Sequence, residues 1–219
     1  MHFTTLGQQN PTPFRLNYVL QALVIGYLVA FGTTAVLTVN GPNWLVENAL
    51  STLLIIILGV SYRQKPLGDL SYLMLTAFML LHIYGAMNSY VENSLGLWLI
   101  RVLETDRNYY DRIVHFSLGF LASYALFDFG RSYLKLPYYW ALLMPIELTL
   151  SISAGFELVE WLWASTAYPE LGPEYLGHQG DPWDAQKDMF IATVGAVLLM
   201  LVVWLTGIGR PKDVKPTTA

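Results

Sequence analysis

Six long apolar runs, separated by short polar connections, dominate the hydropathy pattern of the chain. A helix rises about 1.5 Å per residue and the hydrocarbon core of a bilayer is about 30 Å thick, so about 20 apolar residues are needed to cross it. The pattern therefore predicts an all-α fold, an integral membrane helical bundle that forms a single domain over residues 1–219. The predicted transmembrane helices cover residues 17–39, 44–62, 70–90, 109–132, 138–164 and 190–208.

The distribution of Lys and Arg predicts the orientation of these helices. Basic residues follow the second, fourth and sixth spans, at Arg63, Lys65, Arg131, Lys135, Arg210, Lys212 and Lys215. Because basic loops are retained in the cytoplasm, this side and both termini are predicted to be cytoplasmic. The connection between the third and fourth spans is an exception, with three arginines among four acidic residues. Its residues 95–103 are predicted to lie along the outer surface of the membrane.

Composition narrows the class of protein further. Hydrophobic residues make up 54% of the chain and charged residues only 13%, against about 25% charged in soluble domains. This argues against a soluble enzyme and predicts contact with membrane lipid. The net charge of −4 at pH 7 argues against nucleic acid as a partner. The absence of cysteine excludes a disulfide framework, an iron–sulfur cluster and a thiolate metal site.

Ionisable residues gather near the outer ends of four predicted spans, where they are costly and usually mark function. Asp111 and His115 are four residues apart and Glu157 and Glu160 are three apart, so each pair shares a helical face. Helical rise places the histidines and Glu157 at a similar depth, about 9–12 Å below the outer ends of their spans. The four helices are thus predicted to share one polar layer, formed by His82, Asp111, His115, Glu157, Glu160, Asp181, Asp184 and Asp188.

This combination of residues favours a metal site. Several carboxylates cannot all be ionised side by side without a counter-charge, which a divalent cation would supply. Two imidazoles with several carboxylates suit zinc, manganese or iron, whereas a set dominated by carboxylates also suits magnesium or calcium. Glu160 or Asp181 is the candidate catalytic base. Alternatively, Arg107 and Arg112 neutralise the acids through ion pairs. The candidate metal ligands are His82, Asp111, His115, Glu157, Asp184 and Asp188.

Structural roles also fit individual members of this layer. His82 on its own is typical of a core histidine hydrogen-bonded between helices. Asp111 with His115 also fits a local pair at the start of a helix, and the three later aspartates fit an acidic turn that caps the sixth span. Glu147 lies deeper, and we interpret it as a structural hydrogen bond or a relay rather than a ligand. The shared site is preferred because all of these separate explanations would otherwise have to hold together.

Several motifs resemble those of a known family. Residues 107–116 read Arg-Asn-Tyr-Tyr-Asp-Arg-Ile-Val-His-Phe, which resembles the signature of the YjdF-like family of uncharacterised bacterial inner-membrane proteins. Glu157, the pair Glu160-Trp161 and residues 177–189 are similar to that family as well. The order of the acidic and histidine residues is also similar to the broader VanZ-like pattern, from which Asp188 departs because that pattern usually has Asn there. The resemblance implies a multi-pass protein of the bacterial inner membrane.

The residues and the resemblance together leave two hypotheses open. VanZ-like proteins are associated with glycopeptide resistance, which implies chemistry on envelope lipids or the cell wall, although neither family implies an established reaction. The first hypothesis is therefore a metal-dependent hydrolase or transferase that acts on an envelope or lipid-linked substrate at the outer face. The second is a non-enzymatic protein, either an accessory subunit of a larger membrane complex or a binder of an ion or small solute.

Overall fold

The computed structural model of the chain describes residues 3–7, 12–88, 90–167 and 179–211. Every regular element within these residues is a helix, which confirms the predicted fold class. Six helical stretches within this described part of the chain are long and apolar enough to span a membrane. Their elements are α1 (Tyr18–Leu37), α2 (Gly41–Ser61), α3 (Asp69–Met87), the continuous set α5 (Tyr110–Ser117), η2 (Leu118–Ala122) and α6 (Ser123–Ser132), then α7 (Tyr138–Ala167) and α9 (Asp184–Thr206).

The observed helices extend beyond some predicted spans where polar residues continue the helix. The sixth was expected from residue 190, but α9 begins at Asp184, because its first turn is polar and anchored by ion pairs rather than apolar. Similarly, α2 begins at Gly41, with Pro42 in its first turn and the Asn40 side chain accepting a hydrogen bond from the Asn43 N–H at 3.2 Å. A hydropathy profile does not predict these helix starts, because their residues are polar.

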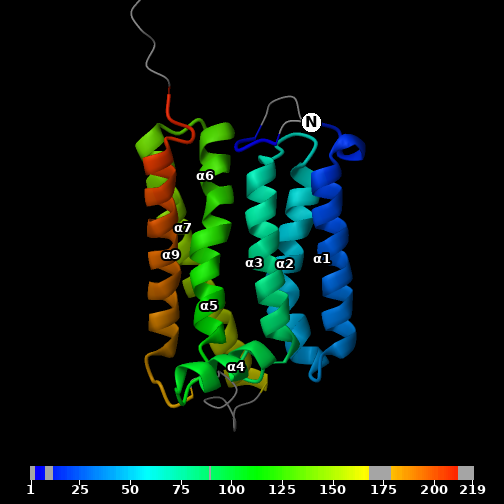
Figure 1. Cartoon of the computed structure of the whole chain (residues 1–219), viewed down its shortest axis with the longest axis vertical. Coiled ribbons are helices and arrows are strands. Elements are labelled where there is room, and N and C mark those ends of the chain that lie inside the picture. The colour runs from blue at the N-terminus through cyan, green and yellow to red at the C-terminus, as the bar shows by residue number, and fades with distance from the viewer. Residues whose placement is uncertain (1–2, 8–11, 89, 168–178, 212–219) are drawn as a thin grey trace, which may run out of the picture.

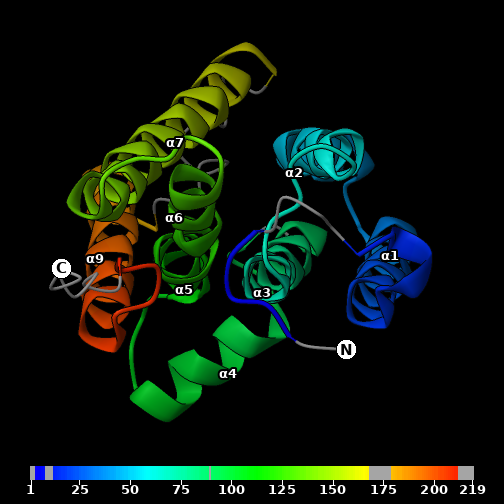
Figure 2. The same cartoon turned by 90° about the horizontal axis from the view of Figure 1, so that it is seen from above.

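The helices form two groups joined by α3 (Figures 1 and 2). One group packs α9 against α7, α5 and η2, and the other packs α1 and α2 against α3. Because α3 also contacts α5, η2 and α6, it links the two groups. We call the end of the bundle that carries residues 3–7 and 207–211 the terminal end, and the opposite end the site end.

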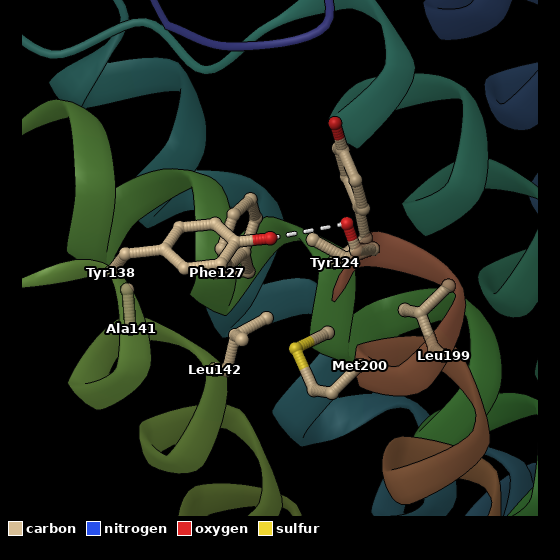
Figure 3. Close-up of a cluster of buried hydrophobic side chains, with 8 residues drawn as sticks. Tyr124, Phe127, Tyr138, Ala141, Leu142, Leu199 and Met200 are labelled. Carbon is tan, nitrogen blue, oxygen red and sulfur yellow. Dashed lines mark hydrogen bonds between the residues drawn. The ribbon is translucent and has the colours of Figure 1, made fainter. Parts of the chain in front are cut away.

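A buried cluster of apolar side chains holds α6, α7 and α9 together near the terminal end (Figure 3). Phe127 is fully buried there between Tyr124 and Tyr138. The Tyr138 hydroxyl donates a hydrogen bond to the carbonyl of Val203 at 3.2 Å, so the polar end of this ring is satisfied within the cluster.

A buried carboxylate organises the terminal end. Asp128 of α6 has no solvent exposure and accepts hydrogen bonds from the backbone N–H groups of Gly7 and Gly68, both at 2.6 Å. It also accepts bonds from the hydroxyls of Ser71 and Ser132, both at 2.7 Å. These four donors, from the segment at residues 3–7, the start of α3 and α6 itself, compensate the buried charge and fix residues 3–7 against the bundle.

The site end is closed on one side by a short amphipathic helix. The helix α4 (Ser94–Leu103) runs across the ends of the spanning helices (Figures 1 and 2). Leu97, Trp98 and Val102 are exposed on its surface, as in helices that lie in a membrane interface. This arrangement agrees with the expectation that residues 95–103 lie along the membrane surface.

A close backbone approach fixes α9 against the middle of the fourth span. The span changes to a π-helical turn at η2, which brings Gly119 against α9. A Cβ atom on Gly119 would collide with the carbonyl oxygen of Ala192, and one on Gly195 would lie 2.5 Å from the carbonyl oxygen of Phe116. Both glycines therefore allow a contact that larger residues would prevent, close to the turn that carries His115.

Substituting Gly119 with Ala should separate these helices and destabilise the protein. Overpacking at so tight a contact costs about 1–3 kcal/mol, which should appear as a lower midpoint of thermal unfolding in detergent. The matched control is Gly26→Ala in α1, where a Cβ atom would meet nothing within 4 Å. Equal midpoints for the two variants would contradict the close contact.

Candidate functional site

His115 lies at the centre of an acidic group at the site end. Its Nε2 atom is 3.3 Å from Oε1 of Glu157 on α7 and 3.6 Å from Oδ1 of Asp111, one turn earlier on α5. The His115 side chain is buried, with 8% of its surface exposed. Two helices therefore direct two carboxylates toward the same nitrogen in a site of low solvent access.

The other ring nitrogen of His115 is held by α7. Nδ1 lies 3.2 Å from the hydroxyl oxygen of Ser153, which is fully buried. If Nδ1 donates this hydrogen bond, the Nε2 lone pair faces Asp111 and Glu157, which is repulsive unless a cation or a carboxyl proton lies between them. If Nε2 carries the single proton instead, it donates a hydrogen bond to one of these acids, and only the doubly protonated ring forms an ion pair with them. Ser153 is a site residue that the sequence analysis missed, although it lies one turn before Glu157 on the same face of its helix.

Asp188 completes a compact set of potential ligands. One ligand atom from each of Asp111, His115 and Asp188 can be chosen so that all three lie within 4.8 Å of one another. The Asp188 side chain is only 2% exposed, and its Oδ1 atom is buried with no hydrogen-bond partner within the described residues. Its nearest cation is Arg112, whose Nε lies 3.8 Å from Oδ1, beyond hydrogen-bond distance.

Two arginines bind the remaining aspartates before and at the start of α9. Arg112 donates hydrogen bonds from Nη2 to Asp181 and to Asp184, both at 3.0 Å. Arg107 also donates a hydrogen bond to Asp184. These ion pairs connect the start of α5 to the start of α9, so they hold Asp188 close to His115. For Asp181 and Asp184, these ion pairs match the predicted alternative, in which the arginines neutralise the carboxylates.

Asp181 lies just before α9, outside the membrane-spanning segment, and is strongly ion-paired. The hydrogen bond donated by Lys187 at 2.6 Å, with further bonds from the Trp183 N–H and Arg112, lowers the pKa of Asp181 to about 2. A carboxylate with so low a pKa is a weak base. The geometry therefore favours an anchoring role for Asp181 over the catalytic role considered from the sequence.

The second span contributes an acid that the sequence analysis did not include. Glu47 of α2 interacts electrostatically with Asp111 and Glu160. Its Oε2 atom is buried without a hydrogen-bond partner within the described residues. Glu47 is the single charged residue within residues 44–62, and this isolated charge in an apolar span could have marked it as a site residue. Glu160 interacts in the same way with Glu157, so the acidic group extends from α9 across α5 and α7 to α2.

His82 occupies a different position from the one expected of a metal ligand. Its Nε2 donates a hydrogen bond to the backbone carbonyl of Glu47 at 3.1 Å, and its Nδ1 accepts one from the Tyr90 hydroxyl at 2.7 Å. A backbone carbonyl can only accept, so this tautomer leaves no nitrogen free for a metal. We therefore leave His82 out of the ligand set, because it connects α3 to α2 and positions Glu47.

The predicted site residues thus divide into three groups, one of which is His82 alone, bonded to Glu47 and Tyr90. Asp111, His115, Glu157 and Asp188 come together as predicted from three helices, with Glu160 beside them. Asp181 and Asp184 belong to the adjoining arginine network. The ligand and base roles themselves stay predictions.

These features define a six-span helical membrane protein with an acidic, histidine-centred group at one end of its bundle. Residues 19–208 match the model of a family described as "Predicted membrane protein (DUF2238)". The chain belongs to this family. It is also 30% identical over 167 residues to "Inner membrane protein YjdF" of Escherichia coli (strain K12), a match that covers 73% of this chain and 76% of that protein.

These matches confirm the resemblance to the YjdF-like family and indicate a multi-pass protein of the inner membrane. No solved structure matches the chain significantly. The more distant VanZ-like resemblance is not shown by these matches and stays a prediction.

Replacing Arg112 with Ala should destabilise the site end. The substitution removes both 3.0 Å ion pairs and the nearest cation to the buried Asp188, whereas Arg107 still pairs with Asp184 and Lys187 with Asp181. Leaving a buried charge fully unpaired costs about 3–5 kcal/mol, so this partial loss should cost about 1–3 kcal/mol. Unfolding in detergent, followed by circular dichroism, measures this loss. Arg101→Ala provides the matched control, because Arg101 is exposed on α4 and surface changes usually stay within about 0.5 kcal/mol. Similar losses in both variants would argue against the arginine network.

Proposed function

We propose that the protein binds a divalent metal ion at the site end and uses it to hydrolyse or transfer a group of an amphipathic envelope substrate. The observation that carries this proposal is the convergence of Asp111, His115 and Asp188, whose ligand atoms lie within 4.8 Å of one another. Glu157 offers a fourth donor, 3.3 Å from His115. The set comes from three separate helices, so it does not follow from local sequence.

The charge balance of the site supports a bound cation. Arg107, Arg112 and Lys187 pair with Asp181 and Asp184. Five further carboxyl groups surround His115 or lie near it: Glu47, Asp111, Glu157, Glu160 and Asp188. So many carboxyl groups in a site of low solvent access require protons or a metal ion to offset their repulsion.

The donor set fits particular metals. One imidazole with carboxylates suits zinc, manganese or iron, and the dominance of oxygen donors also suits magnesium or calcium. The contact between His115 Nδ1 and Ser153 matches the usual arrangement of a metal-binding histidine, whose second nitrogen is held by a neighbouring group. A divalent metal at this position would act as a Lewis acid on a phosphoryl or carbonyl oxygen.

Glu160 is the residue we assign as general base. It lies on the face of α7 that carries Glu157, three residues further on. No hydrogen bond to its carboxylate is seen within the described residues, whereas Asp181 is engaged by Lys187 and Arg112. Glu160 would accept the proton of the attacking water while the substrate is held at the acidic group.

The position of the site suggests its substrate class. Arg63, Lys65 and Lys135 lie in connections at the terminal end and Arg131 in the last turn of α6, so the positive-inside rule predicts that this end is cytoplasmic. The acidic group then opens toward the outer face, near the membrane surface marked by α4. A lipid-linked substrate fits this location because its polar head can reach the site while its tail stays among the lipids.

The second candidate function is metal or small-solute binding without catalysis, for example by an accessory subunit. The arginine network supports this function, because it holds the acidic group in place without requiring turnover. Replacing Glu160 with Gln distinguishes the two functions: an enzyme keeps its metal and loses turnover, whereas binding by a non-catalytic protein is unchanged.

Metal dependence is tested with His115→Ala. This variant should lose the metal that copurifies with the wild type, as measured by elemental mass spectrometry. It should also unfold at a lower temperature, because a metal present at 100 times its dissociation constant stabilises the fold by about 2.7 kcal/mol. A chelator should lower the midpoint of the wild type and leave that of the variant unchanged.

Glu92→Ala serves as the control for this experiment. Glu92 is exposed near the same end of the bundle and makes no ion pair within the described residues, so the variant should keep its metal and its response to chelator. A wild-type protein that contains no stoichiometric metal, and melts identically with and without chelator, would refute the proposal.

A further inference from the structure

Glu147 of α7 is an acidic residue that faces away from the bundle at mid-membrane depth. It follows the exposed Tyr139 by eight residues and precedes the exposed Trp161 by fourteen, so it lies about 12 Å and about 21 Å along the helix from these aromatic residues. Exposed Tyr and Trp mark the two membrane interfaces, and their separation of about 33 Å is close to the thickness of the hydrocarbon core. Glu147 is nevertheless exposed.

The carboxyl group of Glu147 has no hydrogen-bond or ion-pair partner within the described residues. Ser151, one turn later, donates its hydroxyl to the backbone carbonyl of Glu147 at 2.9 Å and not to the carboxyl group. The structure therefore does not support the hydrogen bond or relay inferred from the sequence. Ionisable groups at this depth almost always face protein or water, because hydrocarbon offers them no partner. An exposed one indicates that another protein surface covers it.

The residues around Glu147 suit contact with another helix. Ser151, Ala154 and Gly155 follow on the same side of α7, with Leu158 beyond them. Small residues at such spacing allow the backbones of two membrane helices to approach closely. A Cβ atom on Gly155 would meet nothing within 4 Å. Unlike Gly119, this glycine is therefore not required by any contact within the described part of the chain.

We propose that this face of α7 binds the same face of a second copy, so that the protein forms a homodimer. Two copies inserted in the same direction are related by a two-fold axis along the membrane normal, which places each Glu147 at the same depth as its counterpart. A protonated carboxyl group carries one donor and an acceptor. Two such groups can therefore satisfy each other through a reciprocal pair of O–H···O hydrogen bonds.

The chain favours a second copy over a different protein because both features of this face are self-complementary. A different protein would have to present a hydrogen-bonding side chain at this same depth in the membrane, where polar residues are rare. Two-fold symmetry instead brings a second Glu147 to that depth, and the protonated pair requires no charge in the hydrocarbon. The small residues likewise match their own copies across a two-fold axis, so one face supplies the whole interface.

Cysteine cross-linking tests the interface, since the chain contains no cysteine of its own. Ser151→Cys should form disulfide-linked dimers in native membranes treated with an oxidant, because close packing brings its counterpart within bonding range. Val29→Cys on the exposed face of α1 is the matched control and should stay monomeric. Cross-linking of Ser151→Cys that is no stronger than the control, or that joins it to a different protein, would overturn the proposal.

The role of the carboxyl group is tested by comparing Glu147→Leu with Glu147→Gln. Leucine removes the hydrogen bonds and should weaken dimerisation in bilayers, measured by fluorescence energy transfer, by about tenfold, which corresponds to about 1.4 kcal/mol. Glutamine also carries a donor and an acceptor, and should dimerise within about threefold of the wild type. Unchanged dimerisation of the leucine variant, with an unchanged unfolding midpoint, would contradict the proposed pairing.

Discussion

Carboxyl groups inside the bundle have to be compensated, and the contacts that compensate them determine how the helices meet. At the terminal end, Asp128 accepts four hydrogen bonds, three of them from segments that are distant in sequence. At the site end, Arg107 and Arg112 hold Asp184 and thereby join the starts of α5 and α9. Because unpaired buried charge is so costly, these contacts select one arrangement of helices whose apolar surfaces would accept several.

The buried carboxyl groups at the terminal end and at the site end are compensated in different ways. Asp128 has a complete set of donors, which is the arrangement of a structural anchor. Around His115 the protein instead brings acids together without enough cations, and Oδ1 of Asp188 lacks a hydrogen bond within the described residues. Tight backbone packing at Gly119 and the arginine network keep α9 close to α5, and so hold these carboxyl groups together. An arrangement held in this way, at a cost in stability, is typical of a functional site.

Sequence reasoning predicted the helices well because an apolar run of sufficient length has few alternatives in a membrane. It also brought together Asp111, His115, Glu157 and Asp188, since helical spacing and depth are readable from residue numbers. It did not predict how each helix is rotated about its axis, which depends on packing. That rotation directs both nitrogens of His82 to other partners and turns Glu147 outward. Glu47 was missed because one acid hardly changes the hydropathy of a long apolar span.

The central claim is that the acids around His115 hold a metal ion rather than only a proton. The most direct measurement is an experimental structure with anomalous scattering data, collected on crystals grown with manganese or zinc. The account predicts an anomalous peak within bonding distance of His115 Nε2 and of carboxylate oxygens of Asp111 and Asp188, at about 2.0–2.2 Å for zinc. The absence of such a peak, with His115 in direct hydrogen bonds to Glu157 and Asp111, would contradict it.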